Sequence, residues 1–533
     1  MEGPMATDVR RAQSKVTYAT MMADRLDDVH RELDRAVATV KTRLGEIQPM
    51  YIAGTPVSAA EQFEDRSPID TRILVGRFQS GTREHVHAAV AAAREAFPAW
   101  ASMRWDDRVD LLRRLAQVIH ANRVELTALM GYESGKTRLE CLGDIEESAD
   151  LIEYYCRQFE EHDGFIQQME ALDSHEQNLS VLRPYGVWAV ISPFNFPLAL
   201  AAGPAGAALV SGNTVVFKPA SDTPLLGLKL YEMAQEAGIP AGVFNVVTGL
   251  GDTVGQALID DEGVDGVVFT GSTAVGMKMI RDNARRPAPR PLILEMGGKN
   301  PAIVMKTADL EKATMGIGRS AFSAQGQKCS ACSRVYVHRD IKPKFIDLFV
   351  EKLRAVKVGN PLERGVAIGP VINEAAVRRF EAAVAQAKAD GGRIVYGGRR
   401  LRDGDLAHGY YVEPTVIDNL RDDCPLLQDE LFVPLTIVCE VASLDEAIQR
   451  ANNTEYGLTA GLFSEDDREI ERFYNGVQAG VLYVNRKAGA TTGAWPGVNP
   501  FGGWKASGLT GRGSGGPYYV QQFMHEQSRV RVR

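Results

Sequence analysis

The stretch VWAVISPFNFP, residues 187–197, begins with five apolar residues and ends in a loop that contains two prolines. A continuous apolar run of this length, closed by turn residues, predicts a strand that is buried on both faces. Four more short runs of this kind follow, separated by helical segments: 214–218, 243–247, 266–270 and 292–295. Strands that alternate with helices of ten to fifteen residues predict the α/β class and a doubly wound parallel sheet.

Upstream of this region, apolar residues recur at steps of three and four, which predicts amphipathic helices. The expected helices span 26–44, ended by Gly45, then 84–97, closed by Pro98, then 106–133 and 143–161. A β-hairpin is expected near 50–57. We therefore expect the first helix to be a packing arm and the others to surround the sheet.

Downstream, a second α/β cycle begins at Pro301. Its expected strands are 302–305 and 334–338, and its expected helices lead to Cys329, follow Asp340 and span 374–389. Residues 178–186 alternate in polarity and predict an extended ribbon. The final SRVRVR, residues 528–533, also alternates, and we expect it to be an edge strand that joins the sheet of a neighbouring subunit.

Composition excludes several classes of protein. The chain has 533 residues, of which 45% are hydrophobic and 24% charged, as in an ordinary globular enzyme. A formal net charge of -8 with no basic block argues against nucleic-acid binding. No apolar run is long enough for a membrane span, and the N-terminus lacks the core of a secretory signal. Six cysteines in such a length are not a disulfide framework, so we expect a reduced, cytoplasmic protein.

Chemistry is expected at Cys329, in the run AFSAQGQKCSACSR of residues 321–334. Most cysteines are small buried apolar residues. A thiol in a tight, partly polar corner after a Gly-Gln-Lys turn can be held partly as thiolate, the reactive form. Cys329 and Cys332 form a C-x-x-C, but no second pair or histidine cluster stands at ligand spacing, so no metal is expected. A redox dithiol remains an alternative.

Two further motifs accompany this cysteine: SPFNFP with Asn195, and EMGGK with Glu295. Taken alone, Asn195 is a turn residue and Glu295 a solvated residue at a strand end. Together with GQKC the motifs resemble those of the aldehyde dehydrogenase superfamily, over nearly the whole chain from about residue 50. The resemblance implies that Cys329 is the nucleophile, that Asn195 donates to the oxyanion and that Glu295 is the base for hydrolysis.

The same resemblance implies a nicotinamide cofactor, NAD by preference with NADP not excluded. Lys218 would hold the adenosine ribose, and Ser221 stands where many NAD-specific members carry a glutamate. Glu430 and Phe432, in DELFVP, match the motif that holds the nicotinamide ribose, although Val433 replaces its glycine. The remaining cofactor residues it implies are Ser192, Pro193, Phe194, Gly251, Gly255, Gly271, Ser272 and Gly276.

The run TTGAWPGVNPFGG, residues 491–503, resembles the branch of the family that oxidises L-glutamate γ-semialdehyde. By composition alone this run would be a surface loop. The resemblance implies that the backbone N–H groups of Gly493 and Ala494 bind the substrate carboxylate. It also implies substrate contacts from Phe196, Lys328, Ser330 and Phe501.

The implied fold is aldehyde-dehydrogenase-like, with a cofactor domain on a doubly wound sheet, an α/β catalytic domain and a small β oligomerisation flap. The expected parts are an arm (1–45), the cofactor domain (46–176 and 187–296), the catalytic domain (297–509) and oligomerisation strands (177–186 and 510–533). We expect a homodimer, or a larger assembly of dimers, that oxidises a small carboxylated aldehyde. Alternatives are succinic or aminoadipic semialdehyde as substrate, a CoA-acylating enzyme, and a non-catalytic relative that binds nucleotide.

Overall fold

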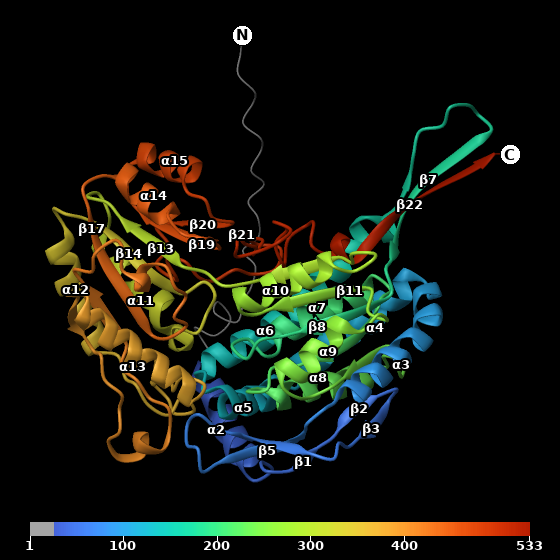
Figure 1. Ribbon diagram of the computed structural model, residues 1–533, viewed down its shortest axis with the longest axis horizontal. Helices are drawn as coiled ribbons and strands as arrows, with labels where there is room; N and C mark the ends of the chain where they lie inside the picture. The colour runs from blue at the N-terminus through green and yellow to red at the C-terminus, as the bar shows by residue number, and fades with distance from the viewer. Residues whose placement is uncertain (1–25, 533) are drawn as a thin grey trace.

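The computed structural model describes residues 26–532, arranged as two lobes that are each built on a seven-stranded sheet (Figure 1). Residues 1–25 of the expected arm and the last residue of the expected tail strand lie outside this range. The strands of the first sheet, in spatial order, are β12 (Leu292–Glu295), β11 (Gly266–Thr270), β8 (Val187–Ile191), β9 (Thr214–Lys218), β10 (Phe244–Val246), β2 (Met50–Ile52) and β3 (Thr55–Val57).

The five strands from β12 to β10 pair in parallel, and the hairpin β2–β3 extends the sheet antiparallel at β10. The predicted parallel sheet and hairpin are therefore confirmed. Chain order runs from β8 outward to β10 and returns on the other side as β11 and β12. Such a reversal creates a crevice beside the first strand, at the carboxyl ends of the strands.

Alternating residues of β8 contribute to two separate cores. Trp188 and Val190 pack on one face, and Val187 and Ala189 on the other. The first face is covered by α4 (Trp105–Ala121), α5 (Arg123–Ser134), α6 (Arg138–Glu161), α7 (Ala199–Val210) and α8 (Pro224–Glu236). The second is covered by α3 (Arg83–Ser102), α9 (Gln256–Asp260) and α10 (Thr273–Ala284). Two covered faces explain why the strand is apolar throughout.

The second sheet follows the same plan. Its order is β15 (Arg393–Tyr396), β16 (Thr415–Asp418), β17 (Leu435–Val441), β14 (Cys332–His338), β13 (Asn300–Val304), β19 (Thr459–Phe463) and β20 (Val481–Val484), parallel except for β15. One face carries α11 (Leu310–Phe322) and α12 (Lys342–Arg354). The other carries α13 (Glu374–Ala389), α14 (Leu444–Asn452) and α15 (Asp467–Gly476). The second predicted α/β cycle is present.

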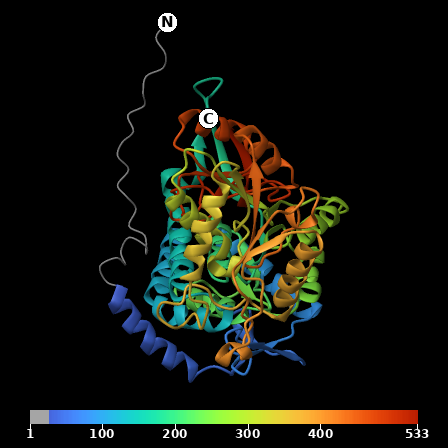
Figure 2. The ribbon, with the colours of Figure 1, turned by 90° about the vertical axis from the view of Figure 1, so that its left-hand side faces the viewer.

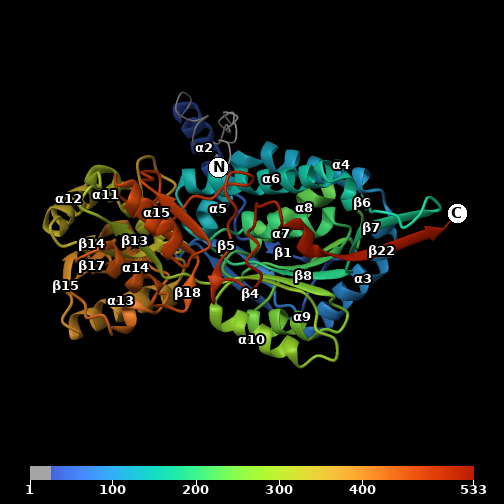
Figure 3. The same ribbon diagram turned by 90° about the horizontal axis from the view of Figure 1, so that it is seen from above.

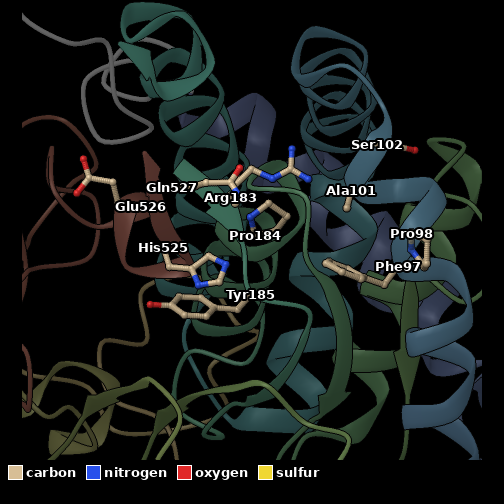
Figure 4. A pocket seen from close by; sticks show the side chains of 10 residues that line it. All are labelled: Phe97, Pro98, Ala101, Ser102, Arg183, Pro184, Tyr185, His525, Glu526 and Gln527. Atoms are coloured by element: carbon tan, nitrogen blue, oxygen red, sulfur yellow. The ribbon is translucent and has the colours of Figure 1, made fainter. Parts of the chain in front are cut away.

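A ribbon of three strands, β6 (Ile166–Gln168), β7 (Glu176–Pro184) and β22 (Met524–Val532), projects away from the first lobe (Figures 1 and 3). β22 pairs antiparallel with β7 of the same chain along its whole length. The tail therefore is an edge strand that pairs with β7 of its own chain on one side, and its expected addition to a neighbouring subunit's sheet stays a prediction. A pocket opens at the ribbon's base, where the rings of Tyr185 and His525 lie with their centroids 4.5 Å apart, tilted by 36° (Figure 4).

Helix boundaries differ from the prediction at Pro98, at Asn122 and at the start of α6, which begins at Arg138 instead of Gly143. α3 continues through Pro98 because Trp100, 1% exposed, anchors the next turn and donates from Nε1 to the Leu209 carbonyl oxygen at 3.1 Å. The single helix expected over 106–133 is split at Asn122 into α4 and α5.

The N-terminal helix α2 (Leu26–Lys41) lies against the outside of the first lobe (Figure 2). Its Asp34 pairs with Arg138 at 2.6 Å and with Arg364 at 2.7 Å, so the arm joins both lobes. A short sheet of β1 (Ile47–Gln48), β5 (Leu74–Gln79) and β4 (Gln62–Arg66) lies beneath. Among the helices of residues 26–532, none is long and apolar enough to cross a bilayer.

Candidate active site

The carboxyl ends of four parallel strands of the first sheet lie at one edge. Ile191 of β8 is level with Lys218 of β9, and Thr270 of β11 with Glu295 of β12. Loops that leave this edge reach the second lobe, where Cys329 follows a tight turn, η3 (Ser323–Gly326). Predicted residues from the two lobes therefore meet at this edge of the first sheet.

Cys329 is partly exposed, whereas the other five cysteines are buried. Its depth in the crevice raises the pKa of the thiol to about 12, the carboxyl groups of Glu430 and Glu295 add to the rise, and the N–H of Ser330 opposes it. Burial of the sulfur, with carboxyl groups beside it, works against the expected partial thiolate, which stays a prediction. The neighbouring Cys332 is buried, and its thiol donates to the carbonyl oxygen of Arg334 at 3.6 Å.

Asn195 is buried, and its Nδ2 donates to the carbonyl oxygen of Gln327 at 2.9 Å. The partner is 132 residues away in sequence, so the side chain joins the lobes instead of closing a local turn. An amide nitrogen carries two hydrogens, and the second can point to a substrate oxygen beside Cys329.

Glu295 lies at the end of β12, where its backbone forms an antiparallel bridge to Gly508. Its carboxyl group is deeply buried, which raises its pKa to about 8, although an N–H from Gly503 opposes the rise. The Oε2 atom has no hydrogen-bond partner within the described part of the chain. A buried carboxyl group with a free oxygen and a pKa near neutrality has the properties of a general base.

The predicted cofactor residues gather at the same strand ends. Lys218 is buried, its Nζ donates to the carbonyl oxygen of Pro219 at 2.7 Å, and burial lowers its pKa to about 8. Ser192 follows β8, and its buried hydroxyl has no partner among residues 26–532. Buried polar groups of this kind are usually satisfied by a ligand or by water. The donor set therefore fits a dinucleotide.

The glycine loops lie beside these donors. Gly251 and Gly255 bound the turn before α9, and a Cβ at Gly255 would lie 3.6 Å from Cδ of Lys218. Gly271 follows β11, and Ser272 is the N-cap of α10, whose second turn contains the buried Gly276. Ser221 lies in the turn after β9, and Pro193 and Phe194 lie in the loop after β8. Helix N-termini next to strand ends are suited to phosphate binding.

Glu430 reaches across from the second lobe. Its Oε1 accepts from the N–H of Gly298 at 3.0 Å, and burial raises its pKa to about 7. A Cβ at Gly297 would lie 2.3 Å from Oε2 of Glu430, so this approach requires glycine. The ring of Phe432 meets that of Phe194 edge-on at 5.8 Å. Phe432 has a φ of 54°, and with valine at position 433 the side chains of Glu430 and Phe432 still contact Gly298 and, in the first lobe, Phe194.

The predicted substrate residues fall into two groups. Thr491 Oγ1 donates to the carbonyl oxygen of Ser330 at 2.7 Å, which places the loop with Gly493 and Ala494 beside the nucleophile. The ring of Phe196 lies 4.0 Å below the ammonium group of Lys136. Two residues make other contacts: Lys328 Nζ donates to Ser323 Oγ at 2.6 Å, and Phe501 pairs through its backbone with Ser514.

Several acidic residues of α6, of which Asp144 is buried and Glu147 and Asp150 are partly exposed, were missed by the sequence reasoning. Asp144 accepts from Lys136 Nζ at 2.8 Å, and burial raises the pKa of Glu147 to about 8. Asp150 accepts from Nε1 of Trp495 at 2.6 Å, which ties the 491–503 loop to this helix. The sequence did contain a signal for these residues: acidic side chains recur at helical spacing among the apolar residues of this helix. Within residues 26–532, no group of three His, Cys, Asp or Glu side chains could hold a metal.

Comparison with known proteins gives consistent results. The profile described as "Aldehyde dehydrogenase family" matches residues 56–528. A 1-pyrroline-5-carboxylate dehydrogenase of Bacillus cytotoxicus is 37% identical over 503 residues, 93% of this chain and 95% of that protein. A Thermus 1-pyrroline-5-carboxylate dehydrogenase with bound NAD has a TM-score of 0.90 at 32% identity, over 96% and 98% of the two chains.

A third relative is larger. Proline utilization A (PutA) from Bdellovibrio bacteriovorus, solved after inactivation by N-propargylglycine, has a TM-score of 0.91 at 34% identity. The match covers 96% of this chain but only 52% of that one, so this chain spans about half of that protein.

Proposed function

Because the chain belongs to the aldehyde dehydrogenase family, we propose that it oxidises L-glutamate γ-semialdehyde to L-glutamate, with NAD as the hydride acceptor. Members of the family use NAD or NADP, and the substrate is an aldehyde. The near full-length likeness to 1-pyrroline-5-carboxylate dehydrogenases supports this substrate, since 1-pyrroline-5-carboxylate is the cyclised form of glutamate γ-semialdehyde.

The thiol of Cys329 gives up its proton to water, and its sulfur attacks the aldehyde carbon; the carbonyl oxygen gains negative charge as the carbon becomes tetrahedral. Asn195 Nδ2 and the backbone N–H of Cys329 donate to this oxygen. Loss of one such donor costs about 3 kcal/mol in the transition state. Departure of hydride from the same carbon restores the C=O bond and leaves a thioester on Cys329, which is readily hydrolysed.

Glu295 completes the cycle as general base. It accepts a proton from water as the water oxygen attacks the thioester carbon, and the C–S bond breaks to give the acid and free Cys329. Its free Oε2 and its raised pKa support this role. A water-activating base also favours hydrolysis over transfer of the acyl group to coenzyme A.

The cofactor, when bound, supplies an acceptor for the hydride. Lys218, Ser221 and Ser192 would bind its adenosine half at the ends of β8 and β9. Gly251, Gly255, Gly271, Ser272 and Gly276 would lie near its phosphates. Glu430 and Phe432 would hold the nicotinamide ribose, with Pro193 and Phe194 along the ring. These roles rest on the family motifs and on the shared position of the residues at the crevice.

The substrate assignment rests above all on the bond from Thr491 Oγ1 to the Ser330 carbonyl oxygen, 2.7 Å long. It brings a glycine-containing loop next to the nucleophile, where the N–H groups of Gly493 and Ala494 can bind the carboxylate of the substrate. Phe196 and Phe501 would line the pocket, with Ser330 as a further donor. Lys328 is directed to Ser323 and supports the loop of the nucleophile.

Steady-state kinetics tests the substrate. We expect kcat/KM to be highest for glutamate γ-semialdehyde, lower for succinic and aminoadipic semialdehydes, and lowest for butanal, which lacks a carboxylate. Addition of coenzyme A should leave the rate unchanged. A butanal value above that of glutamate γ-semialdehyde would disprove the carboxylate site.

For the assembly we propose a homodimer, or a larger assembly of dimers, formed through the ribbon of β7 and β22. The ribbon extends beyond the body, and Val530 and Val532 on it are 64% and 69% exposed. Exposed apolar residues on a projecting strand are typical of a surface that meets a partner.

A further inference from the structure

The turn in front of the nucleophile has an unfavourable backbone. Ala324, Gln325 and Gly326 all lie in the left-handed region, with φ of 48°, 57° and 66°. The left-handed conformation costs a non-glycine residue about 1–2 kcal/mol. Only Gly326 adopts it freely, and a Cβ there would lie 2.4 Å from the carbonyl oxygen of Val433. Ala324 and Gln325 therefore need contacts from outside the turn to stay in place.

Those contacts come from the first lobe. Glu140 Oε1 accepts from the N–H of Ala324 at 2.6 Å, across 184 residues of sequence. Gln325 Nε2 donates to the carbonyl oxygen of Gly135 at 3.2 Å. Both groups sit at the start of α6 or just before it. The charged acceptor of Ala324 is the stronger of the two, because hydrogen bonds to a carboxylate exceed neutral ones.

The second carboxylate oxygen of Glu140, Oε2, makes hydrogen bonds of its own. Oε2 accepts from the N–H of Thr137 at 2.9 Å and from its hydroxyl at 2.8 Å, as in a capping box at the start of α6. The two oxygens thus serve two elements, the helix start and the turn. A side chain with a single acceptor oxygen can serve only one of them.

The turn of residues 323–326 also fixes the position of the reacting groups. Gln327 follows it, and the carbonyl oxygen of Gln327 is the group that holds Asn195 Nδ2 at 2.9 Å. Cys329 lies two residues further on. Lys328, between them, is bonded back to Ser323 at the first residue of the turn. A change in the turn therefore moves the nucleophile and the oxyanion donor relative to each other.

We propose that Glu140 is a positioning residue for the nucleophile: its Oε1 holds the left-handed turn and so sets Cys329 against Asn195. This inference rests on the proposed role of Cys329 but not on the identity of the aldehyde. Misplacing reacting groups by about 1 Å can cost about 100-fold in rate.

The test uses Glu140→Gln, which keeps the shape of the side chain and removes one acceptor. We expect kcat to fall about tenfold or more, and hydrogen–deuterium exchange of the peptide 323–329 to become faster. Thr137→Val is the matched control, because it removes the hydroxyl at the same helix start and leaves the bond to Ala324. It should lower Tm but leave kcat and the exchange of 323–329 as in the wild type.

A rescue variant separates positioning from general stability. Glycine at position 324 adopts a positive φ without cost, so adding Ala324→Gly to Glu140→Gln should restore kcat at least threefold, about 0.7 kcal/mol. The proposal is overturned if Glu140→Gln keeps kcat within twofold of the wild type. It is also overturned if Thr137→Val loses as much activity, or if Ala324→Gly gives no recovery. The exchange measurement needs no substrate, so it stands even if glutamate γ-semialdehyde is not the aldehyde oxidised.

Discussion

Asn195 Nδ2 lies 2.9 Å from the carbonyl oxygen of Gln327, two residues before Cys329. This contact joins the loop after β8 to the loop before β14, and it places an amide donor from one lobe beside a thiol from the other. Because the amide is already bonded on one side, its orientation is fixed before any substrate arrives. A donor that needs no reorganisation is the most effective kind for a developing oxyanion.

Replacing Asn195 by alanine should therefore lower kcat by about 100- to 1,000-fold, the usual loss for one oxyanion donor. Asn195→Asp keeps the shape but replaces the amide with a carboxylate, and it should lose at least as much. Fluorescence titration with NADH should give a Kd near that of the wild type for both. Full activity in Asn195→Ala would remove this residue from the mechanism.

Cys329→Ala should abolish NADH formation and leave NADH binding intact, since the thiol alone forms the bond to carbon. Cys332→Ser should keep kcat within about twofold, because serine can donate to the carbonyl oxygen of Arg334 as the thiol does. Mass spectrometry after iodoacetamide should find the label on Cys329 first. Equal losses in the two variants would support the dithiol alternative, and unchanged turnover in Cys329→Ala would support a different nucleophile.

The rate of hydrolysis should depend on pH through Glu295. Burial raises the pKa of this carboxyl group to about 8, and only its ionised form can accept a proton from water. The fraction ionised, and with it a deacylation-limited kcat, should fall about tenfold for each pH unit below that value. Glu295→Gln should retain a burst of NADH but show slow turnover without this dependence. A profile that stays flat in the wild type would contradict the assignment.

The strands of the first sheet were predicted almost to the residue, because a strand covered on both faces must be apolar along its length. Sequence signals predicted the structure less well where a contact between distant parts of the chain decides how far an element extends or what it pairs with. The packing of Trp100 carries α3 past Pro98, and the tail strand finds β7 in its own chain. The local sequence around Trp100 or around the tail does not predict these contacts, because the partner lies far away in the chain.

In the candidate site, too, motif residues could be predicted from the sequence and contacts between distant residues could not. The motifs with Cys329, Asn195 and Glu295 could be recognised by resemblance, and they do meet at one crevice. The contact of Glu140 with Ala324 could not be predicted, since 184 residues separate them and Glu140 belongs to none of the family motifs. The raised pKa of the Cys329 thiol could not be predicted either, because it depends first on how far the fold buries the sulfur and then on which carboxyl groups lie beside it.

Cofactor choice should respond to a charge at position 221. Ser221 lies three residues after Lys218, in the turn beyond β9. Asp222 beside it accepts from Asn373 at 3.1 Å, so the turn is held against the second lobe. With serine at position 221, the side chain that we propose to lie near the adenosine ribose carries no charge, and the one acidic neighbour in this turn, Asp222, is bonded to Asn373.

Ser221→Glu should lower kcat/KM for NADP by at least tenfold and change that for NAD by less than threefold. Two like charges about 4 Å apart repel by about 4 kcal/mol at an effective dielectric constant of 20, more than enough for that factor. Ser221→Gln is the uncharged control of equal size and should leave the ratio of the two cofactors within about twofold of the wild type. If Gln and Glu reduced NADP use equally, bulk rather than charge would be the cause. Measurement at 50 mM and 500 mM salt separates the two further, because only repulsion between exposed charges weakens with ionic strength.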